Sequence, residues 1–259
     1  MFGNSPQGER KESKNPFLRR IGRDVEEGPS GLGPIDANLD GTYAQPMTTG
    51  GTVAKTGILA LLMLITAGYA YVNPSALFLW GGMFGGLALA MFTIWKPEQT
   101  SWSAPSYALL EGLFVGSASA MYAGIQGGII FQAVSLTIAV LLTMLFLYQT
   151  GLIKVTARLR SMVMAATGAI MLVYLAAIVL GFFGIQIPYL HSAGPIGIGI
   201  SLLIIGVAAF NLLLDFDNIE QGVRAGLPSR YEWVFSMGLL ITLVWIYIEI
   251  LRLLAISRD

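Results

Sequence analysis

The sequence predicts an all-helical protein that crosses a membrane seven times, with its N-terminus in the cytoplasm. Three observations lead to this prediction. Hydrophobic residues make up 55% of the 259 residues and charged residues only 12%, whereas a soluble domain is about one quarter charged. Residues 51–259 hold seven apolar runs, each close to the ~20 residues that a helix needs to span a hydrocarbon core. The loops between these runs carry Lys and Arg in alternation, which is the pattern that orients membrane helices.

Each apolar run is predicted to be a helix, because lipid-facing backbone must be hydrogen bonded within its own segment. A β-barrel does not fit, since barrel strands alternate in hydrophobicity over ~10 residues and these runs do not alternate. Pro105 and Pro195 stand at early helical positions of the third and sixth runs. Ser229 and Glu232 form a capping-box pattern ahead of the seventh run, so the sixth helix is expected to continue beyond Leu214. In chain order the runs are 57–72, which can extend back to Lys55, then 76–95, 107–123, 129–148, 162–183, 196–214 and 233–256.

Residues 1–50 are predicted to be a disordered polar tail, and residues 51–259 to be the helical bundle. The tail lacks the apolar segment of a signal peptide. Lys and Arg occur in the tail, at Lys55 and in the loops after the second, fourth and sixth runs, and they are missing from the other three loops. The positive-inside rule then places the N-terminus in the cytoplasm and the C-terminus outside. The basic residues of the tail, which we interpret as an orientation signal, are Arg10, Lys11, Lys14, Arg19, Arg20 and Arg23.

Small residues recur at four-residue spacing in two of the runs. Gly82 and Gly86 do so in the second run, and Gly112 and Gly116 in the third. Such stripes let helices approach closely in lipid, where no hydrophobic effect drives their association. We therefore expect closely packed helix interfaces along both stripes.

Several function classes are excluded by residue types that the sequence lacks. The chain has no Cys, which rules out disulfides and thiolate metal sites, and its only His is His191. No P-loop, dinucleotide fingerprint or zinc-protease motif is present. The formal net charge is 0, which does not suit a general nucleic-acid binder. We expect neither an enzyme nor a bound cofactor, and the lipid bilayer is the first expected partner.

Three carboxylates interrupt or end the apolar runs and are the main candidate functional residues: Glu111, Asp215 and Glu249. An ionisable side chain at membrane depth costs roughly 2.5–3.5 kcal/mol, so it needs a partner, a water-filled cavity or a function. Asn211 and Asp215 are four residues apart and therefore share a helix face, which we expect to point into the bundle. Asp217 follows on the same helix and is either part of this polar path or an interfacial residue.

Two readings stay open for Glu249 and for Glu111. Arg252 lies three residues after Glu249, so the two either form a local ion pair, with Arg252 extending to the outer interface, or Glu249 serves a polar pathway. Glu111 has no basic residue in its own run, so either another helix satisfies it or it is protonated. Two carboxyl groups in contact would share a proton and sense pH. Deprotonated, the same oxygens suit a hard cation such as calcium.

Several segments together resemble the Bax inhibitor 1-like family, and more specifically its bacterial YccA-like branch. The resemblance covers about residues 50–256 and rests on the order and spacing of Tyr107-Ala-Leu-Leu-Glu111-Gly-Leu-Phe, Tyr148-Gln-Thr-Gly-Leu-Ile-Lys154, Leu213-Leu-Asp215-Phe-Asp217 and Ile246-Tyr-Ile-Glu249-Ile. It implies a bundle around a central seventh helix, a pH-sensitive calcium leak, and a location in the bacterial inner membrane. It also implies an acidic sensor pair, which by motif is Asp215 with Glu249. These two residues are then the candidate calcium ligands.

Two departures from the family pattern bear on that pair. The interval from Asp215 to Glu249 is longer than usual, so the two acids are in register only if the last helix starts deeper in the cytoplasm; otherwise Glu111 replaces one of them. The second run also lacks an interior Arg to hold Asp215, and Lys96 at its end is the nearest candidate. Two other functions remain open: regulation of a membrane partner such as a quality-control protease, and proton-coupled transport.

Overall fold

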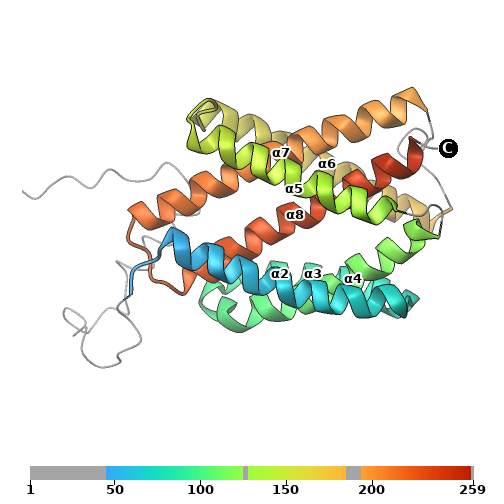
Figure 1. The fold of residues 1–259 in the computed structure, drawn as a ribbon, viewed down its shortest axis with the longest axis horizontal. Helices are drawn as coiled ribbons and strands as arrows, with labels where there is room; N and C mark the ends of the chain where they lie inside the picture. Colours follow the sequence, from blue (N-terminus) through green and yellow to red (C-terminus); the bar gives the residue numbers. More distant parts are fainter. Residues whose placement is uncertain (1–44, 125–127, 185–193, 258–259) are drawn as a thin grey trace, which may run out of the picture. The chain divides into compact units, whose positions relative to one another are not determined.

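The computed structural model describes residues 45–124, 128–184 and 194–257, and within them the chain is helical with seven α-helices. Residues from Pro46 onward belong to one compact unit. The predicted tail up to residue 44, its basic cluster and His191 lie outside the described residues. The helices, drawn in Figure 1, are α2 (Thr49–Val72), α3 (Ala76–Trp95), α4 (Thr100–Ala123), α5 (Ile129–Gln149), α6 (Ala157–Phe182), α7 (Pro195–Arg224) and α8 (Tyr231–Ile256), with a short 3-10 helix η1 (Pro97–Gln99) before α4.

Six of these helices are long and apolar enough to cross a membrane. The exception within the described residues is α4. It is long enough at 24 residues, but several Ser residues and Glu111 interrupt its apolar sequence. The predicted all-helical membrane fold is therefore confirmed at this level. Each of the seven predicted apolar runs corresponds to one helix of the structure.

The helices extend beyond the predicted apolar runs because polar residues cap them or continue them. Thr48 caps α2 by accepting the Gly51 N–H at 2.9 Å, which starts this helix at Thr49. The sixth run continues to Arg224, as expected. The capping box predicted before α8 is not formed. The Glu232 side chain instead accepts the backbone N–H of Thr48 at 2.8 Å and forms an ion pair with Lys55 at 2.7 Å, so this acid ties α8 to the start of α2.

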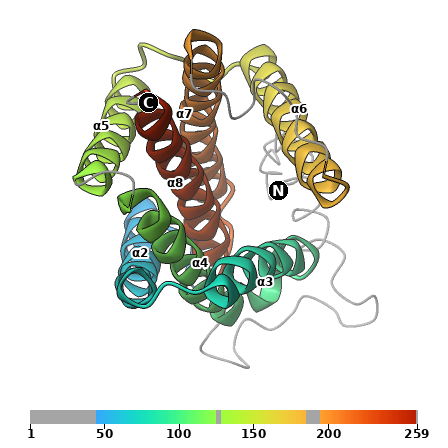
Figure 2. The same cartoon turned by 90° about the vertical axis from the view of Figure 1, so that its right-hand side faces the viewer.

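The last helix, α8, forms the centre of the bundle. Of its most apolar segment 61% is buried inside the protein, against 39% for α7 and at most 17% for the other candidate spans. It packs against α2, α4, α5 and α7, whereas α6 packs mainly on α7. Figure 2 shows α8 running between α5, α7 and the α2–α4 layer, with α6 beside α7. A central seventh helix was implied by the family resemblance, and the structure has this arrangement.

The predicted glycine stripes are confirmed as close helix contacts. A Cβ atom at Gly82 of α3 would lie 2.7 Å from the backbone oxygen of Leu110 in α4. On the opposite side of α4, a Cβ atom at Gly116 would collide with the backbone of α2 at Ala67. Glycine is therefore required at these positions because two backbones approach each other there. The glycines at these contacts allow α2 and α3 to pack closely on two sides of α4.

Gly116→Ala is expected to destabilise the bundle by roughly 1–3 kcal/mol, because the added methyl group must push α2 away from α4. The measurement is the thermal unfolding temperature of the purified protein in detergent. Gly68→Ala is the control, since Gly68 lies on α2 with open space around a Cβ atom. Equal unfolding temperatures for the two variants would contradict the close α2–α4 contact.

Candidate functional site

Asp215 lies on α7 and faces α8. Its Oδ2 atom accepts a hydrogen bond from the Thr242 hydroxyl at 2.7 Å, and the side chain is half-buried. One turn earlier, the Asn211 amide donates to the Thr167 hydroxyl of α6 at 2.7 Å. The predicted polar face of α7 therefore contacts α8 through Asp215 and α6 through Asn211. No basic side chain of the described residues forms an ion pair with Asp215, and that includes Lys96.

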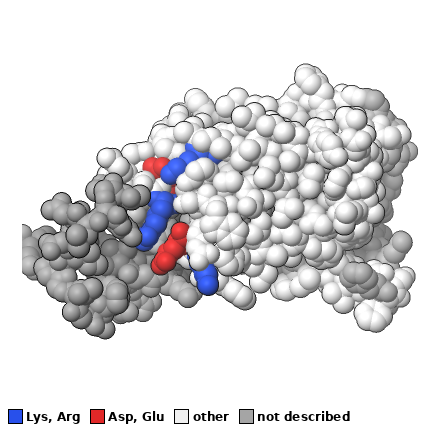
Figure 3. Space-filling view, turned by 90° about the horizontal axis from the view of Figure 1, so that it is seen from below, with Lys and Arg blue, Asp and Glu red and all other residues white. Residues whose placement is uncertain are grey.

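Asp217 belongs to a different group, at the end of the bundle where α7 ends and α6 begins. Its carboxylate forms an ion pair with Arg160 of α6 and accepts a hydrogen bond from Gln221 at 2.5 Å. Glu220, one turn further along, accepts from the Tyr148 hydroxyl and pairs with Arg224. Figure 3 shows charged side chains gathered at one end of this face and none over the rest of it. The structure therefore places Asp217 in a network of ion pairs and hydrogen bonds at this end of the bundle.

Glu249 is part of a buried cluster that joins three helices. We call Tyr174, Ser201, Glu249 and Arg252 the outer polar cluster. Arg252 forms an ion pair with Glu249 at 2.9 Å, and only 8% and 3% of these two residues is exposed. The Tyr174 hydroxyl of α6 donates to Glu249 and accepts from Arg252 at 2.7 Å, while Arg252 also donates to Ser201 of α7 at 3.2 Å.

This cluster contains the predicted ion pair between Glu249 and Arg252, but it corrects the predicted direction of the Arg252 side chain. Arg252 was expected to extend outward to the membrane interface. Its guanidinium instead points into the bundle and lies over the Tyr174 ring, 5.6 Å from the ring centroid. The reason is that Glu249, Tyr174 and Ser201 together supply the charge and hydrogen-bond acceptors that a buried guanidinium needs.

Glu111 lies on α4 and faces α3. Its Oε2 atom is 2.5 Å from where a Cβ atom would be at Gly86, so the glycine makes room for the carboxyl group. Tyr107, one turn earlier on α4, forms a hydrogen bond with it. Glu111 is half-buried and has no ion-pair partner among the described residues. A neighbouring tyrosine therefore satisfies this acid, and no basic side chain in the described part of the chain pairs with it.

The structure does not bring the three acids together. Thr242, which contacts Asp215, lies seven residues before Glu249 on the same helix, which is ~10 Å of helical rise. Neither hydrogen bonds nor ion pairs join Asp215, Glu249 and Glu111 within the part of the chain that the structure describes. In the same residues no three His, Cys, Asp or Glu side chains gather as a metal site would require. Asp215 and Glu249 therefore do not form one calcium site in this arrangement.

Comparison with known families gives a match over almost the whole chain. The family model described as Bax inhibitor 1 like matches residues 4–259. The chain belongs to the Bax inhibitor 1 like family. No curated protein matches the chain significantly.

For this Bax inhibitor 1 like chain, sequence reasoning missed the neutral partners of the acids. Thr242 lies seven residues before Glu249, so the two share a face of α8. This spacing was the one signal in the sequence that could have indicated Thr242 as a polar residue facing the other helices. Tyr174 lies on α6 at a position with no comparable pattern. Asp215 and Glu249 accept hydrogen bonds from hydroxyl groups on neighbouring helices, and Glu111 from a tyrosine on its own helix. A search for opposite charges does not find such partners.

Thr242→Val is expected to destabilise the protein by roughly 1–3 kcal/mol, because it leaves the Asp215 carboxyl without its hydroxyl donor. Thermal unfolding measures the effect, and Thr242→Ser, which keeps the donor, is the control. In the Asp215→Asn background the same substitution should cost much less, since the charged acceptor is gone. Additive effects of the two substitutions would argue against the contact.

Tyr174→Phe is expected to lower the thermal unfolding temperature, because the hydroxyl that bridges Glu249 and Arg252 is lost from a buried site. Tyr69→Phe is the matched control on an exposed ring of α2. A further variant, Glu249→Gln combined with Tyr174→Phe, should cost less than the sum of the single changes. If Tyr174→Phe behaves like Tyr69→Phe, the outer polar cluster does not hold α6 to α8.

Proposed function

We propose that this protein is a cation leak channel whose conduction depends on the protonation of Asp215, with calcium as the first candidate ion. The observation that carries the proposal is a carboxyl group on the core-facing side of α7 with one hydroxyl donor and no ion-pair partner among the described residues. A carboxylate in an apolar bundle without a paired cation is costly, and such residues mark ion and proton pathways. Membership of the Bax inhibitor 1 like family supports the same conclusion.

The proposal includes seven membrane crossings with the N-terminus in the cytoplasm. The seventh crossing is α4, which is long enough and is enclosed by α2, α3 and α8, so its polar residues need not face lipid. The described basic residues other than Arg252 lie at helix ends or in the loops that precede α2, α4, α6 and α8: Lys55, Lys96, Lys154, Arg158, Arg160, Arg224 and Arg230. By the positive-inside rule that end is cytoplasmic. The bacterial inner membrane is the proposed location.

Two polar stations follow each other along α8 in the proposed pathway. Asp215 with Thr242 forms the inner station, and the outer polar cluster forms the outer one, ~10 Å away by helical rise. A deprotonated Asp215 supplies an anionic oxygen, which is the ligand type that calcium prefers. A protonated or amide side chain at this position carries no charge to attract a cation.

The outer polar cluster is proposed to close the pathway. The Arg252 guanidinium neutralises Glu249, so the pair has no net negative charge that would attract a cation. One atom of this cluster, Arg252 Nε, is buried and makes no hydrogen bond within the described residues. Unsatisfied buried polar atoms cost free energy, which favours rearrangement of the cluster when an ion passes. No catalytic step is part of this function.

Calcium flux into liposomes is expected to rise with pH as Asp215 loses its proton, and to stay low at every pH in Asp215→Asn. The measurement is the entry of calcium into liposomes that contain a calcium-sensitive dye, across a series of external pH values. Glu98→Gln is the control, because Glu98 is an exposed acid of η1 outside the bundle interior. Flux that is absent at all pH values, or unchanged in Asp215→Asn, would overturn the proposal.

A further inference from the structure

A cavity of about 1030 Å³ lies between α2 and α5, at the end of the bundle that carries the basic residues. Its walls are one face of α2, including Val53 and Gly57, and one face of α5, including Leu141 and Leu145. Ligand pockets for drug-sized molecules measure roughly 300–1,000 Å³, so this space is large enough for an extended molecule. It is separate from Asp215 and from the outer polar cluster, whose residues do not line it.

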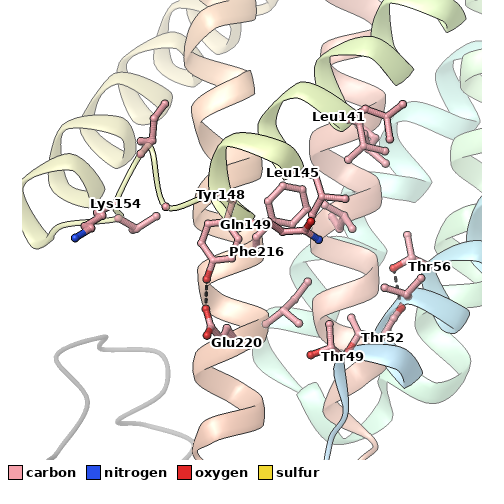
Figure 4. A pocket seen from close by; sticks show the side chains of 18 of the residues that line it. Thr49, Thr52, Thr56, Leu141, Leu145, Tyr148, Gln149, Lys154, Phe216 and Glu220 are labelled. Carbon is pink, nitrogen blue, oxygen red and sulfur yellow. Dashed lines mark hydrogen bonds between the residues drawn. The ribbon is translucent and has the colours of Figure 1, made fainter.

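The inner part of the cavity is apolar. Its floor is formed by Phe216 of α7 and by Leu239 and Leu243 of α8. On α5, Leu141 and Leu145 are one turn apart and face the same space, as Figure 4 shows. The rim residues Val53 and Leu142 are 64% and 58% exposed, so the cavity opens sideways, toward the place of the bilayer. An acyl chain is the molecule that such an apolar and laterally open space fits.

The other end of the cavity is polar and basic. It is lined by Thr49, Gln149, Lys154 and Arg224. Lys154 is exposed and makes no ion pair within the described residues, while Arg224 forms an ion pair with Glu220. With two cations and one carboxylate, this end carries a net positive charge. An anionic phosphate group complements it, and basic side chains at the cytoplasmic surface attract anionic lipids.

Gly57 keeps the cavity open. It stands in the α2 wall, is exposed, and a Cβ atom there would meet nothing within 4 Å. Glycine in a helix interior costs roughly 1 kcal/mol relative to alanine, and close packing does not explain it at this position. A large side chain at Gly57 would extend into the empty space and fill it.

We propose that the α2–α5 cavity is a binding site for an anionic phospholipid of the bilayer. One acyl chain lies against Leu141, Leu145 and Leu243, and the phosphate lies at the end lined by Lys154 and Arg224. The apolar floor lies deeper in the bundle, where the acyl chain of a lipid would be, and the basic end lies where its phosphate group would be. The site does not depend on the proposed ion conduction.

Photo-crosslinking in liposomes tests this site. The full chain is reconstituted in vesicles of phosphatidylcholine and phosphatidylglycerol in which the phosphatidylglycerol carries a photoreactive group on one acyl chain, and labelled peptides are identified by mass spectrometry. Labelling is expected to be concentrated on residues 141–149 and 239–243. Gly57→Phe should reduce it to the level of other lipid-facing helices, whereas Gly68→Phe, at an equally exposed and open position of α2 outside the cavity, should not.

The headgroup contact has its own control. Replacing Lys154 and Arg224 by Gln should lower the preference for phosphatidylglycerol over phosphatidylcholine, by about fivefold for each charge that is lost. Lys96 and Arg158 are exposed basic residues at the same end that do not line the cavity, and the same replacement there should leave the preference unchanged. Thermal unfolding verifies that all variants are folded. Even labelling of all helices, or labelling unaffected by Gly57→Phe, would overturn the proposal.

Discussion

A charged side chain inside this bundle must be compensated by groups on its own or neighbouring helices, because the hydrocarbon around it offers no water. This constraint shapes the arrangement of α6, α7 and α8. Arg252 and Glu249 neutralise each other on α8, Tyr174 of α6 forms hydrogen bonds with both of them, and Ser201 of α7 accepts one from Arg252. These partners can reach the polar groups of α8 because α8 lies at the centre of the bundle.

The same constraint separates the acids into two types. Glu232 and Asp217 have full basic partners, Lys55 and Arg160, at the basic end of the bundle. Asp215 and Glu111 have only hydroxyl partners, on Thr242 and Tyr107. A paired acid fixes helices to each other, whereas an acid held by a hydroxyl alone retains a choice between its two protonation states. The proposed gate is therefore at Asp215 and not at the fully paired acids nearby.

The sequence was sufficient for the helices and insufficient for the contacts between them. The apolar runs predicted the seven helices. The glycine spacing predicted close contacts at Gly82 and Gly116 but not the helices that they approach, which the structure identifies as α4 and α2. The spacing of three residues between Glu249 and Arg252 predicted their ion pair, because residues three apart on a helix are neighbours. The partner of Asp215 could not be found in this way. It depends on the relative depth of α7 and α8, which is set by the loop between them and by the anchoring of α8 through Glu232 to Lys55.

The relative depth of α7 and α8 also explains why the family's acidic pair is not seen here. With Asp215 level with Thr242, a carboxylate would have to stand near position 242 to share a proton with it, and the chain has a hydroxyl there. Glu249 stands ~10 Å further along and is occupied by Arg252. A sliding motion of α8 large enough to bring Glu249 to Asp215 would break the Glu232–Lys55 pair and the outer polar cluster together. A local change at Asp215 that leaves α8 in place keeps the Glu232–Lys55 pair, and it is the less costly way to open the proposed pathway.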